Sequence, residues 1–200
     1  MVLASTLSMS GIAGSVAAGF RRLLGWRRPA PTAGRTGAGD APQATGYDTG
    51  MNGADILCDT LLASGIDTCI ANPGTSEMHF VAALDRKPAM RCVLGLSESV
   101  VTGIADGYAR MAERPAATLL HLGPGLANGL ANLHNARRAR TPMVTVVGDH
   151  ASHHLPFDAP LTTDIETLAR PMSDWVRRVN GPADVSRAAA EAVSVAMTPP

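Results

Sequence analysis

The feature that most constrains the fold is an alternation, from Met51 onward, of short apolar runs with helical patterns. Apolar runs typical of strands occupy residues 66–71, 91–96, 116–122, 142–149 and 175–179. Helical patterns occupy residues 54–63 and 76–84, the stretch after residue 96, the stretch from GPG (123–125) to Arg140, and the stretch from Asp184 to Met197. Strands that alternate with helices in this way favour a parallel sheet covered on both faces. We therefore predict an α/β fold, a three-layer doubly wound parallel sheet.

Both ends of the chain differ from this pattern. Residues 29–50 are rich in Pro, Gly, Ala and Thr, and residues 1–50 hold five arginines, so we predict a disordered Arg-containing extension over 1–50. Organelle targeting by residues 1–35, or an over-long start with Met51 as the true beginning, remain alternatives. The chain stops at TPP after a helix, so we expect 51–200 to be a domain truncated at its C-terminus and lacking its last strand.

Charge and composition exclude several classes of function. Residues 51–200 hold 12 basic and 15 acidic side chains, so no basic patch suited to nucleic acid is expected. No uncharged apolar run approaches 18 residues there, which excludes a membrane span. The charged content of 17% is low and suggests contact with another subunit. The three cysteines, Cys58, Cys69 and Cys92, lie in apolar runs, which predicts buried, reduced thiols and a cytoplasmic protein.

Polar residues and glycines follow each of the first four predicted strands. In order along the chain these are Asn72, Thr75 and Glu77; Ser97 and Glu98; His121 and Asn128, with GPG between them; and Gly148, Asp149 and His150. Ligands of open parallel sheets bind beyond the carboxyl ends of the strands. This convergence therefore predicts a ligand site at that edge.

Glu98 is the residue with the most informative position. The helix that it begins has apolar residues at the spacing of a half-buried helix: Val100, Val101, Ile104, Ala105, Tyr108 and Met111. An acid in the first turn of a helix is favoured by the macrodipole by about 0.3–1 kcal/mol, which would make its role structural. The alternative is a half-buried carboxylate that holds and hands over a proton. Ser99, Gly103 and Gly107 follow at intervals of four, and helical glycines cost about 1 kcal/mol each. These residues predict a smooth ridge that another helix, of a second subunit, can approach closely.

The other candidate residues and motifs have structural interpretations as well. His121 is either a satisfied histidine at a strand end or an acid–base group. Thr75 is expected to cap the helix after NPG. The His-rich loop GDHASHHLPFD at 148–158 has no regular period to fix metal ligands, so no metal site is predicted there. GPGLANG lacks the lysine and the spacing of a phosphate-binding loop.

Several motifs together resemble a known family. NPGTSEMHF, ESVVTGIADGYAR, the strand ending in His121, GPGLANGLANLHNARRARTP and VVGD are similar to the N-terminal pyrimidine-binding domain of thiamin diphosphate-dependent enzymes, in particular acetolactate synthase and benzoylformate decarboxylase. The resemblance runs from about Met51 to the last residue. It implies a thiamin diphosphate-dependent enzyme that decarboxylates or carboligates small 2-oxo acids, of which this chain supplies half of the site. A non-catalytic paralogue or a dimerisation module is the alternative.

The resemblance also implies residue roles. Glu98 matches the family glutamate that bonds the pyrimidine N1′ and relays a proton, and Pro73, Thr75 and Asn128 join it as cofactor-binding residues. His121 stands 23 residues after Glu98, where benzoylformate decarboxylase-like members carry a catalytic histidine, and Thr75 takes the place of their active-site serine. Typical acetolactate synthases lack that histidine, so His121 and Thr75 favour decarboxylation.

The resemblance further implies partners that these 200 residues do not supply. The family holds the diphosphate and Mg²⁺ through a GDG…N motif in another domain, and no GDG occurs here. We expect that domain in cis or on a partner chain, a homodimer or tetramer formed through the pyrimidine domain, and no turnover by the isolated chain.

Overall fold

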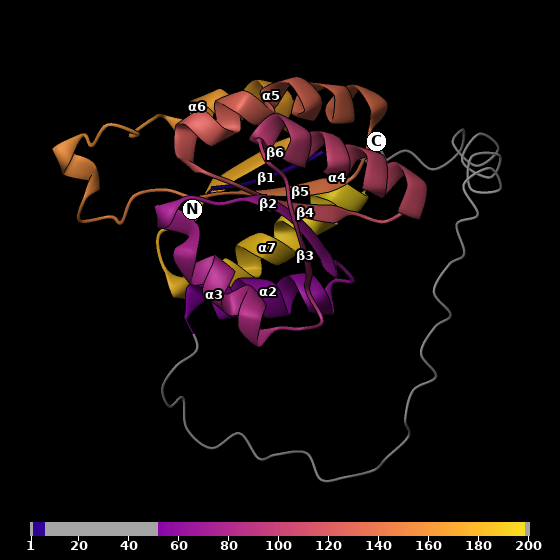
Figure 1. Ribbon diagram of the computed structural model, residues 1–200, viewed down its shortest axis with the longest axis horizontal. Coiled ribbons are helices and arrows are strands. Elements are labelled where there is room, and N and C mark those ends of the chain that lie inside the picture. Colours follow the sequence, from indigo (N-terminus) through magenta and orange to yellow (C-terminus); the bar gives the residue numbers. More distant parts are fainter. Residues whose placement is uncertain (1, 7–51, 199–200) are drawn as a thin grey trace, which may run out of the picture.

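The computed structural model describes residues 2–6 and 52–198, which form a six-stranded sheet between two layers of helices (Figure 1). The strand order is β3-β2-β4-β5-β1-β6. The strands are β1 (Val2–Thr6), β2 (Thr68–Asn72), β3 (Arg91–Leu94), β4 (Ala116–Leu120), β5 (Met143–Val147) and β6 (Trp175–Arg178). The helices are α2 (Gly53–Ala63), α3 (Met78–Arg86), α4 (Glu98–Ala112), α5 (Leu122–Ala139), α6 (Ile165–Ala169) and α7 (Pro182–Met197).

The central strands are buried on both faces, as their continuous apolar sequences predict. All residues of β4 and β5 are buried, and β2 to β5 pair in parallel. Neighbouring residues of β4 point to opposite faces: Leu119 packs in one core cluster and Leu120 in the other. This alternation divides the apolar interior into two cores, one on each side of the sheet, and confirms the three-layer α/β fold.

The two helical layers can be followed in Figure 1. Helices α4, α5 and α6 cover one face, and α2, α3 and α7 cover the other. The boundaries differ from the predicted ones by only a few residues. Among the differences, β3 ends at Leu94 rather than Leu96, a 3-10 turn, Thr75–Glu77, precedes α3, and α5 begins at Leu122, so that GPG lies in its first turn.

The prediction of a disordered extension over 1–50 is wrong for Val2–Thr6, and the prediction of a wholly parallel sheet is wrong at the same place. These five residues form β1, which pairs antiparallel with both β5 and β6. The pairing with β5 is uninterrupted, from Val2 opposite Val147 to Thr6 opposite Met143. Residues 7–51, including the Pro/Gly-rich stretch 29–50, lie outside the described residues.

Two predictions about the burial of side chains are also wrong. Val100 and Ile104 of α4 are 47% and 39% exposed, because the buried face of α4 consists instead of Glu98, Val101, Thr102, Ala105 and Ala109. Cys92, on the edge strand β3, is exposed, whereas Cys58 and Cys69 are buried as predicted. Within the part of the chain that the structure describes, no helix has the length and apolar character needed to cross a membrane.

Candidate functional site at the carboxyl edge of the sheet

Glu98 occupies the first turn of α4, where the chain turns out of the β3 loop into the helix. Its side chain is buried, with 9% of the residue exposed. Oε2 accepts a hydrogen bond from Nδ2 of Asn128 at 3.2 Å. No residue in 2–6 or 52–198 donates to Oε1. Glu98 therefore presents one anchored and one free carboxylate oxygen in a buried setting.

Close packing of α4 against α5 fixes the backbone at Glu98. Oγ1 of Thr102 lies 3.0 Å from the Glu98 carbonyl and 3.1 Å from the Gly129 carbonyl, so its single proton joins the two helices. Nδ2 of Asn132 donates to the Ser99 carbonyl at 2.7 Å, and a methyl group on Gly103 would lie only 3.0 Å from that nitrogen. Gly103 thus allows contact with α5 of the same chain.

The outcome differs for the last residue of the predicted ridge. A methyl group on Gly107 would meet no atom within 4 Å in this chain. Gly107 is exposed, so its lack of a side chain serves no close contact within the described residues. The two glycines of the predicted ridge therefore differ. Gly103 serves the packing of this domain, whereas the subunit contact predicted at Gly107 is not tested by a single chain.

Gly125, the second glycine of GPG, brings Glu98 and His121 together. A methyl group on Gly125 would lie 2.9 Å from Oε1 of Glu98 and 3.3 Å from Cβ of His121. Such distances are shorter than side chains tolerate without movement, so only glycine leaves the carboxylate in place. The predicted catalytic pair Glu98 and His121 consequently borders one small space at the start of α5.

His121 directly follows β4 and is the N-cap residue of α5. Its ring lies against the backbone of Gly74, where a methyl group would come within 2.3 Å of Nδ1 and Cε1. Nδ1 is 2.7 Å from Oε2 of Glu77, whose side chain is 1% exposed, and the backbone amide of Gly74 donates to the same oxygen at 2.8 Å. The loop after β2 thus holds the imidazole in place.

Sequence reasoning placed Glu77 at this edge of the sheet but gave it no role. The available signal was its spacing, three residues after a glycine in NPGTSE, because an acid at that position can accept from the backbone amide at the start of the turn. Its contact with His121, 44 residues away, follows only from the three-dimensional structure.

The remaining predicted residues flank this centre. Thr75 is exposed and directly follows Gly74, at the start of the 3-10 turn. The N-cap residues of this turn and of α3 are Gly74 and Glu77, so the prediction that Thr75 caps the helix is wrong. Pro73 is partly buried just before Gly74. Nδ2 of Asn72 donates to the Gly95 carbonyl at 2.7 Å and ties the loop after β2 to the loop before α4. Thr75, Pro73, Asn128 and His121 all lie on segments that contact one another around Glu98.

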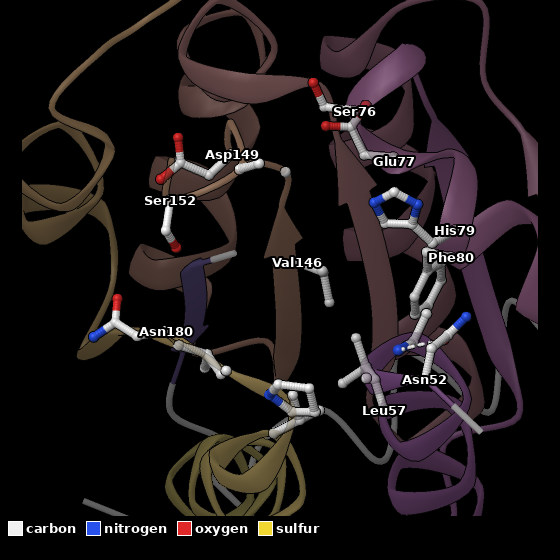
Figure 2. Close-up of a pocket in the computed structure, with 18 of the residues that line it drawn as sticks. Asn52, Leu57, Ser76, Glu77, His79, Phe80, Val146, Asp149, Ser152 and Asn180 are labelled. Carbon is white, nitrogen blue, oxygen red and sulfur yellow. Dashed lines mark hydrogen bonds between the residues drawn. The ribbon is translucent and has the colours of Figure 1, made fainter. Parts of the chain in front are cut away.

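A cleft of about 490 Å³ opens at the same edge on the α2/α3/α7 face of the sheet. Figure 2 shows Ser76, Glu77 and His79 along one wall, Asp149, Ser152 and Asn180 along the other, and Val146 between them. Asp149 is occupied by an ion pair with Arg178 of β6. Glu77 borders the cleft and His121 alike, so it stands between this face and the Glu98 side.

The His-rich loop after β5 does not gather its side chains around one point. The rings of His150 and His154 are 5.4 Å apart and tilted, and His154 packs next against Phe157. Across residues 2–6 and 52–198 no group of three or more His, Cys, Asp and Glu side chains could hold a metal ion. The loop makes ring contacts of the kind that aromatic side chains prefer.

The free oxygen of Glu98 fits the group that the sequence resemblance implies. A buried carboxylate with one unpartnered oxygen can bond a ring nitrogen and exchange a proton with it. Gly125 keeps the space beside that oxygen clear of a side chain. Glu98, with Asn128 behind it, is thus suited to hold the N1′ edge of an aminopyrimidine ring.

Comparisons with known proteins agree with this geometry. Residues 51–168 match the family described as thiamine pyrophosphate enzyme, N-terminal TPP binding domain. A Mycobacterium tuberculosis protein that bears the name acetolactate synthase large subunit IlvX is 65% identical over 144 residues, which are 72% of this chain and 28% of that protein. Benzoylformate decarboxylase of Pseudomonas aeruginosa is 34% identical over 143 residues, 71% of this chain and 27% of the enzyme.

The solved structures include the thiamine diphosphate-dependent 4-hydroxybenzoylformate decarboxylase of Rhodococcus jostii RHA1. It superposes with a TM-score of 0.69 at 27% identity, over 74% of this chain and 29% of that chain. The chain thus spans about a quarter to a third of the length of the relatives that it matches. On the match to residues 51–168, the chain belongs to the thiamine pyrophosphate enzyme family and carries the N-terminal TPP-binding domain of an acetolactate synthase-like member.

Proposed function

We propose that this chain supplies the pyrimidine-binding half of a thiamin diphosphate site that acts on 2-oxo acids. The observation that carries the proposal is the buried Glu98 carboxylate, with Oε2 bonded to Asn128 and Oε1 free beside Gly125. A purely structural acid at a helix N-terminus would point to backbone amides or to water. Here one oxygen accepts instead from the Asn128 side chain, and the other stays free beside Gly125, next to the second acid–base candidate, His121.

The residues divide the work as follows. Glu98 holds a proton at the pyrimidine N1′ and returns it, and Asn128 keeps the carboxylate oriented. His121, on the other side of Gly125, is placed to exchange a proton with a substrate, and the exposed hydroxyl of Thr75 is available to the same substrate. The bound cofactor supplies the stabilisation of negative charge that 2-oxo acid chemistry needs. The diphosphate and Mg²⁺ would be held by a domain outside these residues.

Two outcomes of the chemistry have support. The high identity to the protein named as acetolactate synthase favours carboligation. The placement of His121 beside Glu98, together with the names of the relatives from Pseudomonas and Rhodococcus, favours decarboxylation of a 2-oxo acid. We give decarboxylation as the first step in either case, since carboligation of 2-oxo acids begins with loss of carbon dioxide.

A second subunit would complete the site. Leu96, Val100 and Ile104 form an exposed apolar strip that leads into and along α4, next to the helix end that bears Glu98. An exposed apolar strip of this kind is typical of a subunit contact. We propose that this strip is the contact of a homodimer and that Gly107 lies within it.

The proposal is tested on the isolated chain by NMR titration with thiamin diphosphate and with an analogue in which a C–H replaces N1′ of the pyrimidine. Loss of a charge-assisted hydrogen bond costs about 1.5–3 kcal/mol, so we expect thiamin diphosphate to bind at least ~10-fold more tightly than the analogue. Shift changes should centre on Glu98, Gly125 and Asn128. Equal binding of the two compounds would remove the basis of the proposal.

A further inference from the structure

The geometry points to Glu77 as a positioning residue that fixes the tautomer and the orientation of His121. Nδ1 of His121 and Oε2 of Glu77 are 2.7 Å apart. A carboxylate can only accept a hydrogen bond, so in the neutral ring the proton belongs on Nδ1. Nε2, which has no hydrogen bond to residues 2–6 or 52–198, is then left as the proton acceptor. An acid–base histidine whose tautomer is set by a third group is a recurring arrangement.

Three contacts hold Glu77 itself. The residue is 3% exposed, and its Oε2 accepts from the Gly74 amide at 2.8 Å as well as from His121. Its Oε1 is buried without a hydrogen-bond partner in the described part of the chain and lies against Gly148, where a methyl group would come within 1.5 Å. Leaving a buried carboxylate oxygen unpaired is costly, so a purely structural role for Glu77 is a poor explanation of this arrangement.

Glycines flank the Glu77–His121 pair at two places where a larger residue would collide with it. Gly74 lies under the imidazole, and Gly148, directly after β5, lies over the carboxylate. Neither glycine has a positive φ, so alanine fits the backbone at both positions and would act through the collision alone. Gly148 therefore offers a way to move Glu77 without changing its chemistry.

The test is NMR on the 200-residue chain labelled with ¹⁵N-histidine, at about pH 8.5, two units above the ordinary histidine pKa of about 6.5. The protonated and unprotonated ring nitrogens have well-separated shifts, and a His121→Gln variant assigns the signal. We expect Nδ1–H in the wild type. A wild-type ring that carries its proton on Nε2 alone would overturn the inference, whatever the variants do.

The variants separate positioning from general stability. Glu77→Gln, whose amide can donate as well as accept, should shift the tautomer ratio of His121 toward Nε2–H by at least ~10-fold. Gly148→Ala, which keeps Glu77 but displaces its side chain, should shift the ratio in the same direction. Glu77→Asp, which keeps the carboxylate, should restore part of the Nδ1–H population. Glu191→Gln, which removes a surface carboxylate paired with Arg177, is the matched control and should leave His121 unchanged. Unchanged tautomers in Glu77→Gln would also overturn the inference.

What the oriented Nε2 does to a substrate rests on the proposed function, but the tautomer does not. If thiamin diphosphate fails to discriminate against its N1′ analogue while Nδ1 of His121 is protonated, the proposed function fails and the positioning role stands. If the cofactor binds as expected and the tautomer is wrong, the reverse holds.

Discussion

Gly125 lies so close to Glu98 that the hydrogen on its Cα is the largest substituent the carboxylate allows. A methyl group there would be 2.9 Å from Oε1. Because the contact is with the far end of a flexible side chain, the carboxylate would move and the backbone would stay. This relation makes the orientation of Glu98 separable from the stability of the fold.

Gly125→Ala should therefore weaken the binding of thiamin diphosphate by ~10-fold or more while changing the free energy of unfolding by no more than about 1 kcal/mol, since alanine is favoured in a helix. NMR titration and urea unfolding measure the two effects. Gly53→Ala, at the first residue of α2, places its methyl group in ordinary contact with Val185 at 3.5 Å and serves as the control. Unfolding of Gly125→Ala would show that the contact is not confined to the carboxylate.

Glu98→Gln keeps the shape of the side chain and removes its ability to take up a proton. The test uses a chimera: the Mycobacterium tuberculosis relative in which residues 52–198 of this chain replace the matching segment. In this chimera Glu98→Gln should slow deuterium exchange at C2 of bound thiamin diphosphate by ~10²-fold or more. Binding should fall far less, because the amide can still donate to N1′. Exchange at the wild-type rate would exclude Glu98 as the proton relay.

The ion pair of Asp55 with Arg86 should make stability depend on pH. The hydrogen bonds from Arg86, and then that from the Asn52 amide, hold the pKa of Asp55 below its ordinary value of 3.8. With a folded pKa below the unfolded one, the stabilisation is complete above about pH 4 and is lost as the pH falls through the folded pKa. Urea midpoints between pH 7 and pH 2 should fall less steeply in Asp55→Asn.

Asp59→Asn is the matched control for this effect. Asp59 also pairs with a cation, Lys87, but its side chain is 45% exposed, where ion pairs contribute little. Its midpoints should follow those of the wild type. A wild-type slope in Asp55→Asn as well would place the acid sensitivity elsewhere.

The cysteines should differ in reactivity. Burial raises the pKa of Cys58 to about 11 and that of Cys69 well above its ordinary value. Partial burial raises the pKa of Cys92 as well, but Cys92 is the exposed cysteine, on the edge strand β3. The thiolate is the reactive form, so at pH 8 a disulfide reagent should modify Cys92 rapidly in the folded chain and the other two only after denaturation. Cys92→Ser should abolish the fast phase, and fast modification of Cys58 would contradict the described packing.

A chain that begins at Met51 should be less stable than the full chain. It lacks β1, which pairs with β5 along five residues and with β6 along four. Hydrogen bonds contribute about 0.5–1.5 kcal/mol each, so we expect a loss of about 2 kcal/mol or more in unfolding free energy, together with association through the opened strand edges. Urea unfolding and light scattering measure these, and equal stability would show that β1 adds nothing to the sheet.

The sequence predicted those parts of the fold that local patterns determine. β2, β4 and β5 are short apolar runs bounded by turn residues, and α2 begins at an Asn52 cap and ends near Gly65, so their positions could be predicted within a few residues. β1 could not be predicted, because five residues of mixed character gain strand structure only from pairing with strands about 140 and 170 residues away. The short α6 carries too little periodicity to be recognised.

The candidate site shows the same division. Glu98, His121 and Asn128 could be predicted from motif spacing, and the structure brings them together around Gly125. Glu77 was not recognised as a partner of His121, since no local pattern tells which of several acids at a sheet edge will contact a given imidazole. The exposure of Val100 and Ile104 was missed because the apolar spacing of α4 fits two adjacent faces, and only the position of α5 decides which is buried.

The place of β1 in the sheet has a consequence for how the molecule assembles. In the described sheet, β6 is joined to the other strands through β1. The first residues of the chain can therefore pair with β6 only after nearly all the other residues have been synthesised. Contacts between such distant segments form slowly, because a long loop must close first. The half of the molecule that holds Glu98 and His121 pairs among nearby segments, so it can take shape before the two ends of the chain meet.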